Sequence, residues 1–108
     1  MEAMLFIPEI LDLVGDGQLK DRESKVITKK EYVNVVLMYL PAGDSLQDHR
    51  TTHLTIVHFL SGKGKMNLNG KMRSVKPDSW IYMSSEFTHL VIAEEDLKFL
   101  LYVIKQKI

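Results

Sequence analysis

The sequence has no cysteine, no net charge and no long apolar run, and each absence excludes a class of protein. Without cysteine there are no disulfide bonds, thiolate zinc sites or cysteine nucleophiles. Lysine plus arginine number 14 and aspartate plus glutamate also number 14. The cationic excess that a broad nucleic-acid surface or a polybasic membrane patch requires is therefore missing. We expect neither a nucleic acid nor a membrane as a partner.

The apolar segments are also too short for a membrane span, because none approaches the roughly 20 residues that a bilayer requires. Residues 1–9 lack the basic start and the apolar core of a secretory signal peptide. We therefore expect a cytoplasmic protein. With 108 residues, of which 45% are hydrophobic and 26% charged, the chain has the size and composition of one globular domain, residues 1–108.

What the sequence does contain is a series of short β-branched and aromatic runs separated by turn residues. These runs are residues 26–28, 32–40, 54–60, 65–68, 71–75, 80–83, 89–92 and 99–104. Asn69-Gly70 predicts a tight hairpin, because such a turn needs left-handed conformations at both central residues. Strands at this spacing are typical of a sandwich or barrel. The sequence predicts an all-β barrel over residues 25–108 and an N-terminal segment, 1–24, that contains a helical turn or an edge strand.

The last predicted strand, residues 99–104, is apolar at consecutive positions, so both of its faces should be covered. In a barrel one face points to the interior. The other face needs cover from the N-terminal segment or from a second subunit. Together with the net charge of zero, this pattern predicts a homodimer.

Histidines at positions 49, 53, 58 and 89 are the candidates for chemistry, because imidazole titrates near neutral pH and binds metal ions well. His49 follows a turn and enters a strand, and His89 begins another strand far along the chain. His53 shares the parity of Thr55, so a regular strand would turn it inward. His58 has the opposite parity and should point away from the interior.

The spacing around His49 resembles the first motif of the cupin superfamily. That motif runs glycine, five residues, histidine, one residue, histidine, three or four residues, glutamate, six residues, glycine. The corresponding residues here are Gly43, His49, Thr51, Thr55 and Gly62. Both glycines and the first histidine are kept, while threonines stand in place of the second histidine and the glutamate.

The region around His89 is similar to the second cupin motif, in which only the histidine is identical. The corresponding residues here are Asp78, Ser84, Glu86, His89 and Ala93. The resemblance covers about residues 32–104. It implies a double-stranded β-helix, or jelly roll, whose barrel encloses a pocket.

In metal-binding cupins the ligands are three histidines and a glutamate. The resemblance therefore implies that His49 and His89 face the interior as catalytic residues and as metal ligands. His53 is no motif residue, but its strand parity makes it a third candidate ligand. Imidazole ligands suit zinc, iron, nickel or copper, and manganese is a further candidate. Thr51 and Thr55 weaken this site, because a hydroxyl is a poor neutral ligand and the missing carboxylate no longer offsets the cation's charge. A barrel without metal is an equal alternative.

The predicted ligand-binding residues are Thr51 and Thr55, whose hydroxyls form hydrogen bonds, and Trp80 and Tyr82, which we expect to line the core or the interior. The first hypothesis is a barrel that binds a polar small molecule, sugar-like or carboxylated, with a reduced or absent divalent-metal site. The second hypothesis is a cupin metalloenzyme of the dioxygenase or isomerase type. The third is a dimeric sensing or scaffold module without catalysis.

Overall fold

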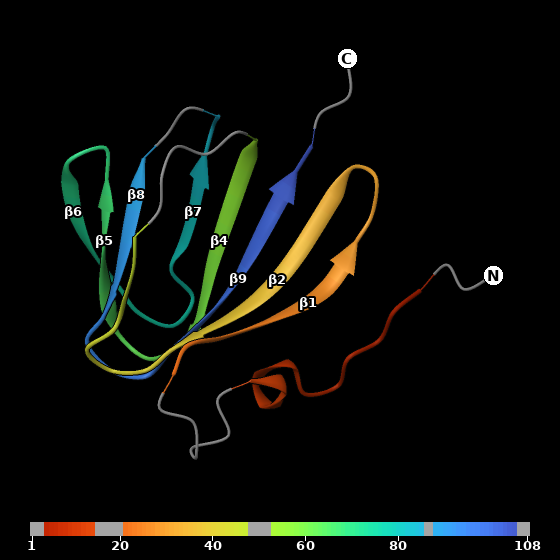
Figure 1. Ribbon diagram of the computed structural model, residues 1–108, viewed down its shortest axis with the longest axis horizontal. Coiled ribbons are helices and arrows are strands. Elements are labelled where there is room, and N and C mark those ends of the chain that lie inside the picture. Colours follow the sequence, from red (N-terminus) through yellow and green to blue (C-terminus); the bar gives the residue numbers. More distant parts are fainter. Residues whose placement is uncertain (1–3, 15–20, 48–52, 86–87, 106–108) are drawn as a thin grey trace.

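The computed structural model describes residues 4–14, 21–47, 53–85 and 88–105, and these form two antiparallel sheets (Figure 1). A 3-10 helix, η1 (Ile10–Leu13), precedes the strands. The strands are β1 (Glu23–Lys29), β2 (Val33–Leu40), β3 (Ser45–Gln47), β4 (Leu54–Ser61), β5 (Gly64–Leu68), β6 (Lys71–Val75), β7 (Trp80–Met83), β8 (His89–Ala93) and β9 (Leu97–Ile104). The predicted all-β jelly roll is confirmed.

The five-stranded sheet has the order β1-β2-β9-β4-β7, and the four-stranded sheet has the order β3-β8-β5-β6. Strands distant in the sequence are therefore neighbours, as in a double-stranded β-helix. Asn69 has φ 50° and Gly70 has φ 91°, so the predicted tight hairpin between β5 and β6 is confirmed. The short strand β3 had no signal in the sequence beyond one leucine between polar residues.

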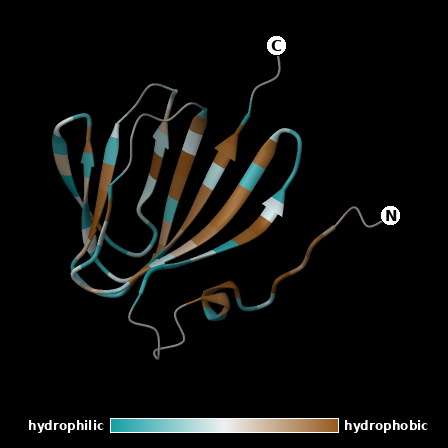
Figure 2. Ribbon diagram, viewed as in Figure 1, coloured by the Kyte–Doolittle hydropathy of each residue, from teal (hydrophilic) through white to brown (hydrophobic). Residues whose placement is uncertain are grey.

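Side chains from both sheets meet in one apolar interior. Its largest fully buried members include Phe59 of β4 and Phe99 of β9, whose ring centroids lie 5.2 Å apart. Met66 of β5 and Val91 of β8 face them from the other sheet. Figure 2 shows long hydrophobic stretches along the central strands β2, β9 and β4. The alternation of buried and half-buried positions along β4 and β8 shows which side chains point inward.

A second apolar cluster lies on the outer face of the five-stranded sheet. Leu37, Tyr39 and Leu100 are buried there beneath Val14, which is 2% exposed. The ammonium group of Lys98 donates a hydrogen bond to the carbonyl oxygen of Leu11, at 2.6 Å, and ties η1 to the sheet. The N-terminal segment thus supplies the cover that the doubly apolar last strand requires. The predicted homodimer stays a prediction.

Two ends of the barrel can now be defined from the strand directions in Figure 1. The upper end holds the ends of β5, β7 and β9 and the starts of β4 and β8. The lower end holds the ends of β4 and β8 and the starts of β5 and β9. None of the helices in the described ranges has the length and apolar character that crossing a bilayer requires.

Candidate functional site

His89 lies at the upper end as the first residue of β8. It pairs with Leu68 of β5, and Leu68 packs against the interior cluster, so His89 is on the interior face of the four-stranded sheet. The side chain is buried, with 6% of the residue exposed. The prediction that His89 points inward is confirmed. A buried imidazole that donates from one nitrogen and accepts at the other can form two directed contacts.

Thr55 occupies the corresponding level of the five-stranded sheet. It pairs with Met83 of β7 on one side and Val103 of β9 on the other, and it is 6% exposed. Its hydroxyl donates a hydrogen bond to the carbonyl oxygen of His53 at 3.1 Å. The oxygen lone pairs are still able to accept a hydrogen bond. The predicted inward orientation of Thr55 is confirmed, and the motif position of a metal-binding glutamate is taken by a neutral acceptor.

Asn34 of β2 completes this row and was not predicted as a site residue. It pairs with Val103, and it shares its strand parity with Val36 and Met38, which pack in the interior. Its Oδ1 atom is buried and has no hydrogen-bond partner among the residues that the structure describes. A polar residue at an inward position of an apolar strand was the signal in the sequence. Buried polar atoms are usually hydrogen-bonded, so an unsatisfied one calls for an explanation.

The other predicted histidines are less well positioned for an interior site. His53 precedes β4 and is exposed. His58 lies on the outer face, where its Nε2 atom is 3.6 Å from a carboxylate oxygen of Asp78. The outward orientation predicted for His58 is confirmed. His49 and Thr51 lie outside the described residues, so their predicted roles stay predictions. Glu86 of the second motif also lies outside them.

The prediction that Trp80 and Tyr82 line the core or the interior is wrong. They are 57% and 55% exposed, whereas Ile81 and Met83, which alternate with them in β7, pack inside. The physical reason is the period of two along a strand, which allows only one of the two pairs to face inward. The apolar side chains of Ile81 and Met83 fill the interior, and the larger aromatic side chains, each with a polar group, face solvent.

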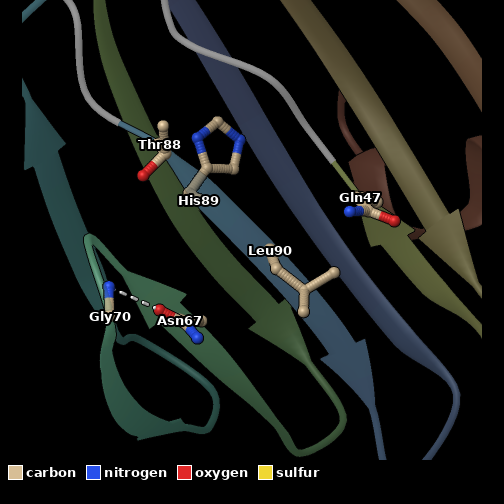
Figure 3. Close-up of a pocket in the computed structure, with 6 residues that line it drawn as sticks. All are labelled: Gln47, Asn67, Gly70, Thr88, His89 and Leu90. Carbon is tan, nitrogen blue, oxygen red and sulfur yellow. Dashed lines mark hydrogen bonds between the residues drawn. The ribbon is translucent and has the colours of Figure 1, made fainter.

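A hollow of about 300 Å³ lies at the upper end of the four-stranded sheet (Figure 3). Its lining residues are Gln47, Asn67, Gly70, Thr88, His89 and Leu90. None of them except His89 was predicted as a site residue. The hollow combines side chains from β3, β5 and β8 with the hairpin turn between β5 and β6. We call it the outer hollow.

A divalent metal, which this type of barrel often binds, does not fit the donors that the structure describes. Within residues 4–14, 21–47, 53–85 and 88–105, no three histidine, aspartate or glutamate side chains are grouped closely enough to hold a cation. The described interior donors are the imidazole of His89, the hydroxyl of Thr55 and the amide of Asn34. All are neutral groups that leave the charge of a buried cation uncompensated.

Solved structures of known fold resemble this chain over most of its length. No protein-family model matches the sequence, and no curated protein matches it either. A cupin 2 conserved barrel protein from Leptotrichia buccalis superposes with a TM-score of 0.83 at 10% identity, over 94% of this chain and 50% of that one. An RmlC-like cupin with a double-stranded β-helix from Methanocaldococcus jannaschii gives a TM-score of 0.73 at 15% identity, over 82% and 84%. This chain has the cupin fold.

Another structure with the same fold covers nearly the whole chain. The conserved SPY1581 protein of unknown function from Streptococcus pyogenes has a TM-score of 0.77 and 20% identity, over 99% of this chain and 100% of that one. The cupin fold predicted from the two motifs is therefore confirmed. At these levels of identity the likeness concerns the fold, and the chemistry has to be argued from the site.

Proposed function

We propose that the protein binds a polar small molecule in the barrel interior at the upper end, where the divalent-metal site is incomplete or absent. One observation supports this most directly. The interior is apolar from the lower end upward, but Thr55 and His89, both 6% exposed, face it from opposite sheets at the upper end. Ligand pockets are typically apolar with a few polar groups that fix orientation.

The energetic argument is that buried polar groups destabilise a fold unless each is hydrogen-bonded. An unsatisfied buried amide or hydroxyl costs roughly 1–3 kcal/mol. Asn34 keeps a buried carbonyl oxygen without a partner in the described part of the chain. A ligand that donates to Asn34 and Thr55 would satisfy both acceptors. The site thus suits a molecule with hydroxyl or amide donors.

His89 has the chemistry to bind such a ligand and to exchange a proton with it, because imidazole works as donor, acceptor and base. His49, the other histidine of the cupin-like motifs, would supply a second imidazole from the segment between β3 and β4. We assign both residues to ligand binding and proton transfer. No step of this proposal requires a metal ion.

A metalloenzyme of the dioxygenase or isomerase type is the second candidate. It is suggested by a likeness in fold to salicylate 1,2-dioxygenase from Pseudoaminobacter salicylatoxidans, with a TM-score of 0.71 and 13% identity over 81% of this chain and 26% of that one. In that case His49, His89 and His53 would be the ligands. The exposed side chain of His53 weakens this alternative relative to the first.

Two measurements on protein purified without a histidine tag test the proposal. A thermal-shift screen of hydroxylated and carboxylated metabolites should find a ligand that raises the melting temperature by mass action. Thr55→Val should abolish that shift. Thr28→Val, which makes the same chemical change on a half-buried position of β1, should leave it intact.

Elemental analysis separates the two candidates. Less than stoichiometric metal together with a Thr55-dependent ligand supports the binding proposal. A stoichiometric metal that is lost in His49→Ala supports the metalloenzyme instead. If no metabolite shifts the melting temperature and the His49→Ala, His89→Ala double variant folds normally, a sensing or scaffold module is the better description.

A further inference from the structure

The outer hollow lies on the face of the four-stranded sheet that points away from the barrel interior. Gln47, Leu90 and Asn67 form a row across β3, β8 and β5. The residues that alternate with them along these strands pack in the interior and are Leu46, Val91 and Met66. Since side chains alternate between faces, the row points outward. The hollow is thus distinct from the interior site proposed above, although His89 borders both.

Two carboxamides stand on either side of an apolar floor in this row. Figure 3 shows Gln47 and Asn67 flanking Leu90 on the near face of the sheet. The Oδ1 atom of Asn67 accepts a hydrogen bond from the backbone nitrogen of Gly70 at 2.8 Å. This bond fixes the amide, so the NH₂ group of Asn67 faces away from the turn as a donor.

Hydrogen bonds around Asn69 make the upper wall of the hollow rigid. The Oδ1 atom of Asn69 accepts from the backbone nitrogen of Thr88 at 2.9 Å and from its hydroxyl at 2.8 Å. The backbone nitrogen of Asn69 donates to the carbonyl oxygen of Thr88 at 3.1 Å. The hairpin tip is therefore fastened to the start of β8. A preformed wall lowers the entropy that a ligand loses on binding.

We propose that the outer hollow is a binding site for a neutral saccharide, held by the carboxamides of Gln47 and Asn67 over the side chain of Leu90.

The lining chemistry selects this ligand class. The described lining residues include two carboxamides, a threonine and a histidine but no aspartate, glutamate, lysine or arginine, so none of them offers a fixed charge to a charged ligand. A carboxamide donates and accepts hydrogen bonds, as a sugar hydroxyl does. Leu90 is half-buried and offers an apolar surface to the C–H face of a pyranose ring. The volume of about 300 Å³ accommodates one ring with part of a second.

The test is a nuclear magnetic resonance titration of the uniformly ¹⁵N-labelled full chain with glucose, mannose, galactose, maltose and cellobiose. Glucuronate, which keeps the pyranose ring and adds a carboxylate, serves as the charged counterpart of glucose. The side-chain NH₂ signals of Gln47 and Asn67 report directly on the hollow in the wild-type protein, so this readout does not depend on any variant. We expect one or more neutral sugars to shift both signals with millimolar affinity, and glucuronate to shift neither.

Variants localise the binding. Asn67→Asp keeps the oxygen that accepts from Gly70 and removes the donor, so it should weaken binding about tenfold, as losing one hydrogen bond does. Gln47→Ala should have a similar effect. Ser45→Ala, on the same face of β3 two residues earlier, is the matched control and should leave the affinity unchanged.

Several outcomes overturn the proposal. It is wrong if no neutral sugar shifts the two NH₂ signals, or if glucuronate shifts them as strongly as glucose does. It is also wrong if Asn67→Asp and Gln47→Ala bind as the wild type does. Thr55→Val separates the two sites, because sugar binding that Thr55→Val abolishes would belong to the interior site. Sugar binding that survives Thr55→Val supports the outer hollow, whatever the fate of the interior proposal.

Discussion

The lower and upper ends of the barrel are built from different residues although the same strands run through both. At the lower end, Leu40, Phe59 and Leu97 are completely buried, and none of the buried side chains described there is polar. At the upper end, the buried side chains that face the interior include the polar residues Thr55 and His89. The contrast indicates that the lower end provides stability, while the upper end gives up part of that stability for polar groups that a ligand can use.

The largest loss of stability is expected from a substitution that leaves a cavity at the lower end. Phe59→Ala removes a fully buried ring that stacks at a tilt on Phe99, so the free energy of unfolding should fall by about 3–5 kcal/mol. Urea denaturation followed by fluorescence of the single tryptophan measures this change. If Phe59→Ala lowers the free energy of unfolding by less than a substitution at the upper end does, the lower end is not the main source of stability and the comparison is wrong.

A pair of glycines sharpens the comparison within the lower end. Gly62 has φ +87°, and a Cβ atom there would lie 1.9 Å from the carbonyl oxygen of Asp96. Gly43 has φ +90°, but a Cβ atom would meet nothing within 4 Å. Gly62→Ala adds a backbone clash to the conformational strain that both variants share. It should therefore destabilise the protein by roughly 2 kcal/mol more than Gly43→Ala in the same denaturation assay.

Val14 tests the outer apolar cluster, which belongs to neither end. This residue is 2% exposed and covers Leu37, Tyr39 and Leu100. Val14→Ala should lower the free energy of unfolding by roughly 1–2 kcal/mol, because two buried methyl groups are lost. Val26→Ala, at a valine of β1 that is 59% exposed, is the control and should change little. Equal losses for both variants would show that the N-terminal segment does not cover the sheet.

The smallest effect on stability is expected at the upper end. Thr55→Val keeps the shape of the side chain and replaces the hydroxyl that bonds to the His53 carbonyl oxygen. Since His53 is exposed, water can donate a hydrogen bond to its carbonyl oxygen in place of Thr55. The free energy of unfolding should therefore change by less than about 1 kcal/mol. A loss comparable with that of Phe59→Ala would mean that Thr55 is a structural residue.

The sequence predicted the fold well because alternation and turn chemistry are local signals. Asn69-Gly70 favours a tight hairpin through its own backbone preferences, and the structure has positive φ at both residues. The motif spacing also predicted that His89 faces the interior. Orientation in short strands was harder, because Trp80 to Met83 are all apolar or aromatic and either face would fit the composition.

The outer hollow had no signal in the sequence. Gln47, Leu90 and Asn67 come from three strands, and only the register between those strands makes them neighbours. Asn34 did have a signal, as the one polar residue among the apolar positions of residues 33–40. Its parity relative to Val36 would have identified it as inward-facing.

The most direct measurement for the central claim is the free energy of unfolding of His89→Leu beside that of the wild type. Leucine has a volume similar to that of histidine and suits the apolar neighbours Leu68 and Val91. If His89 serves a ligand, His89→Leu should be at least as stable as the wild type to within about 1 kcal/mol, and should lose metabolite binding. A loss of stability above about 2 kcal/mol with binding intact would contradict the account.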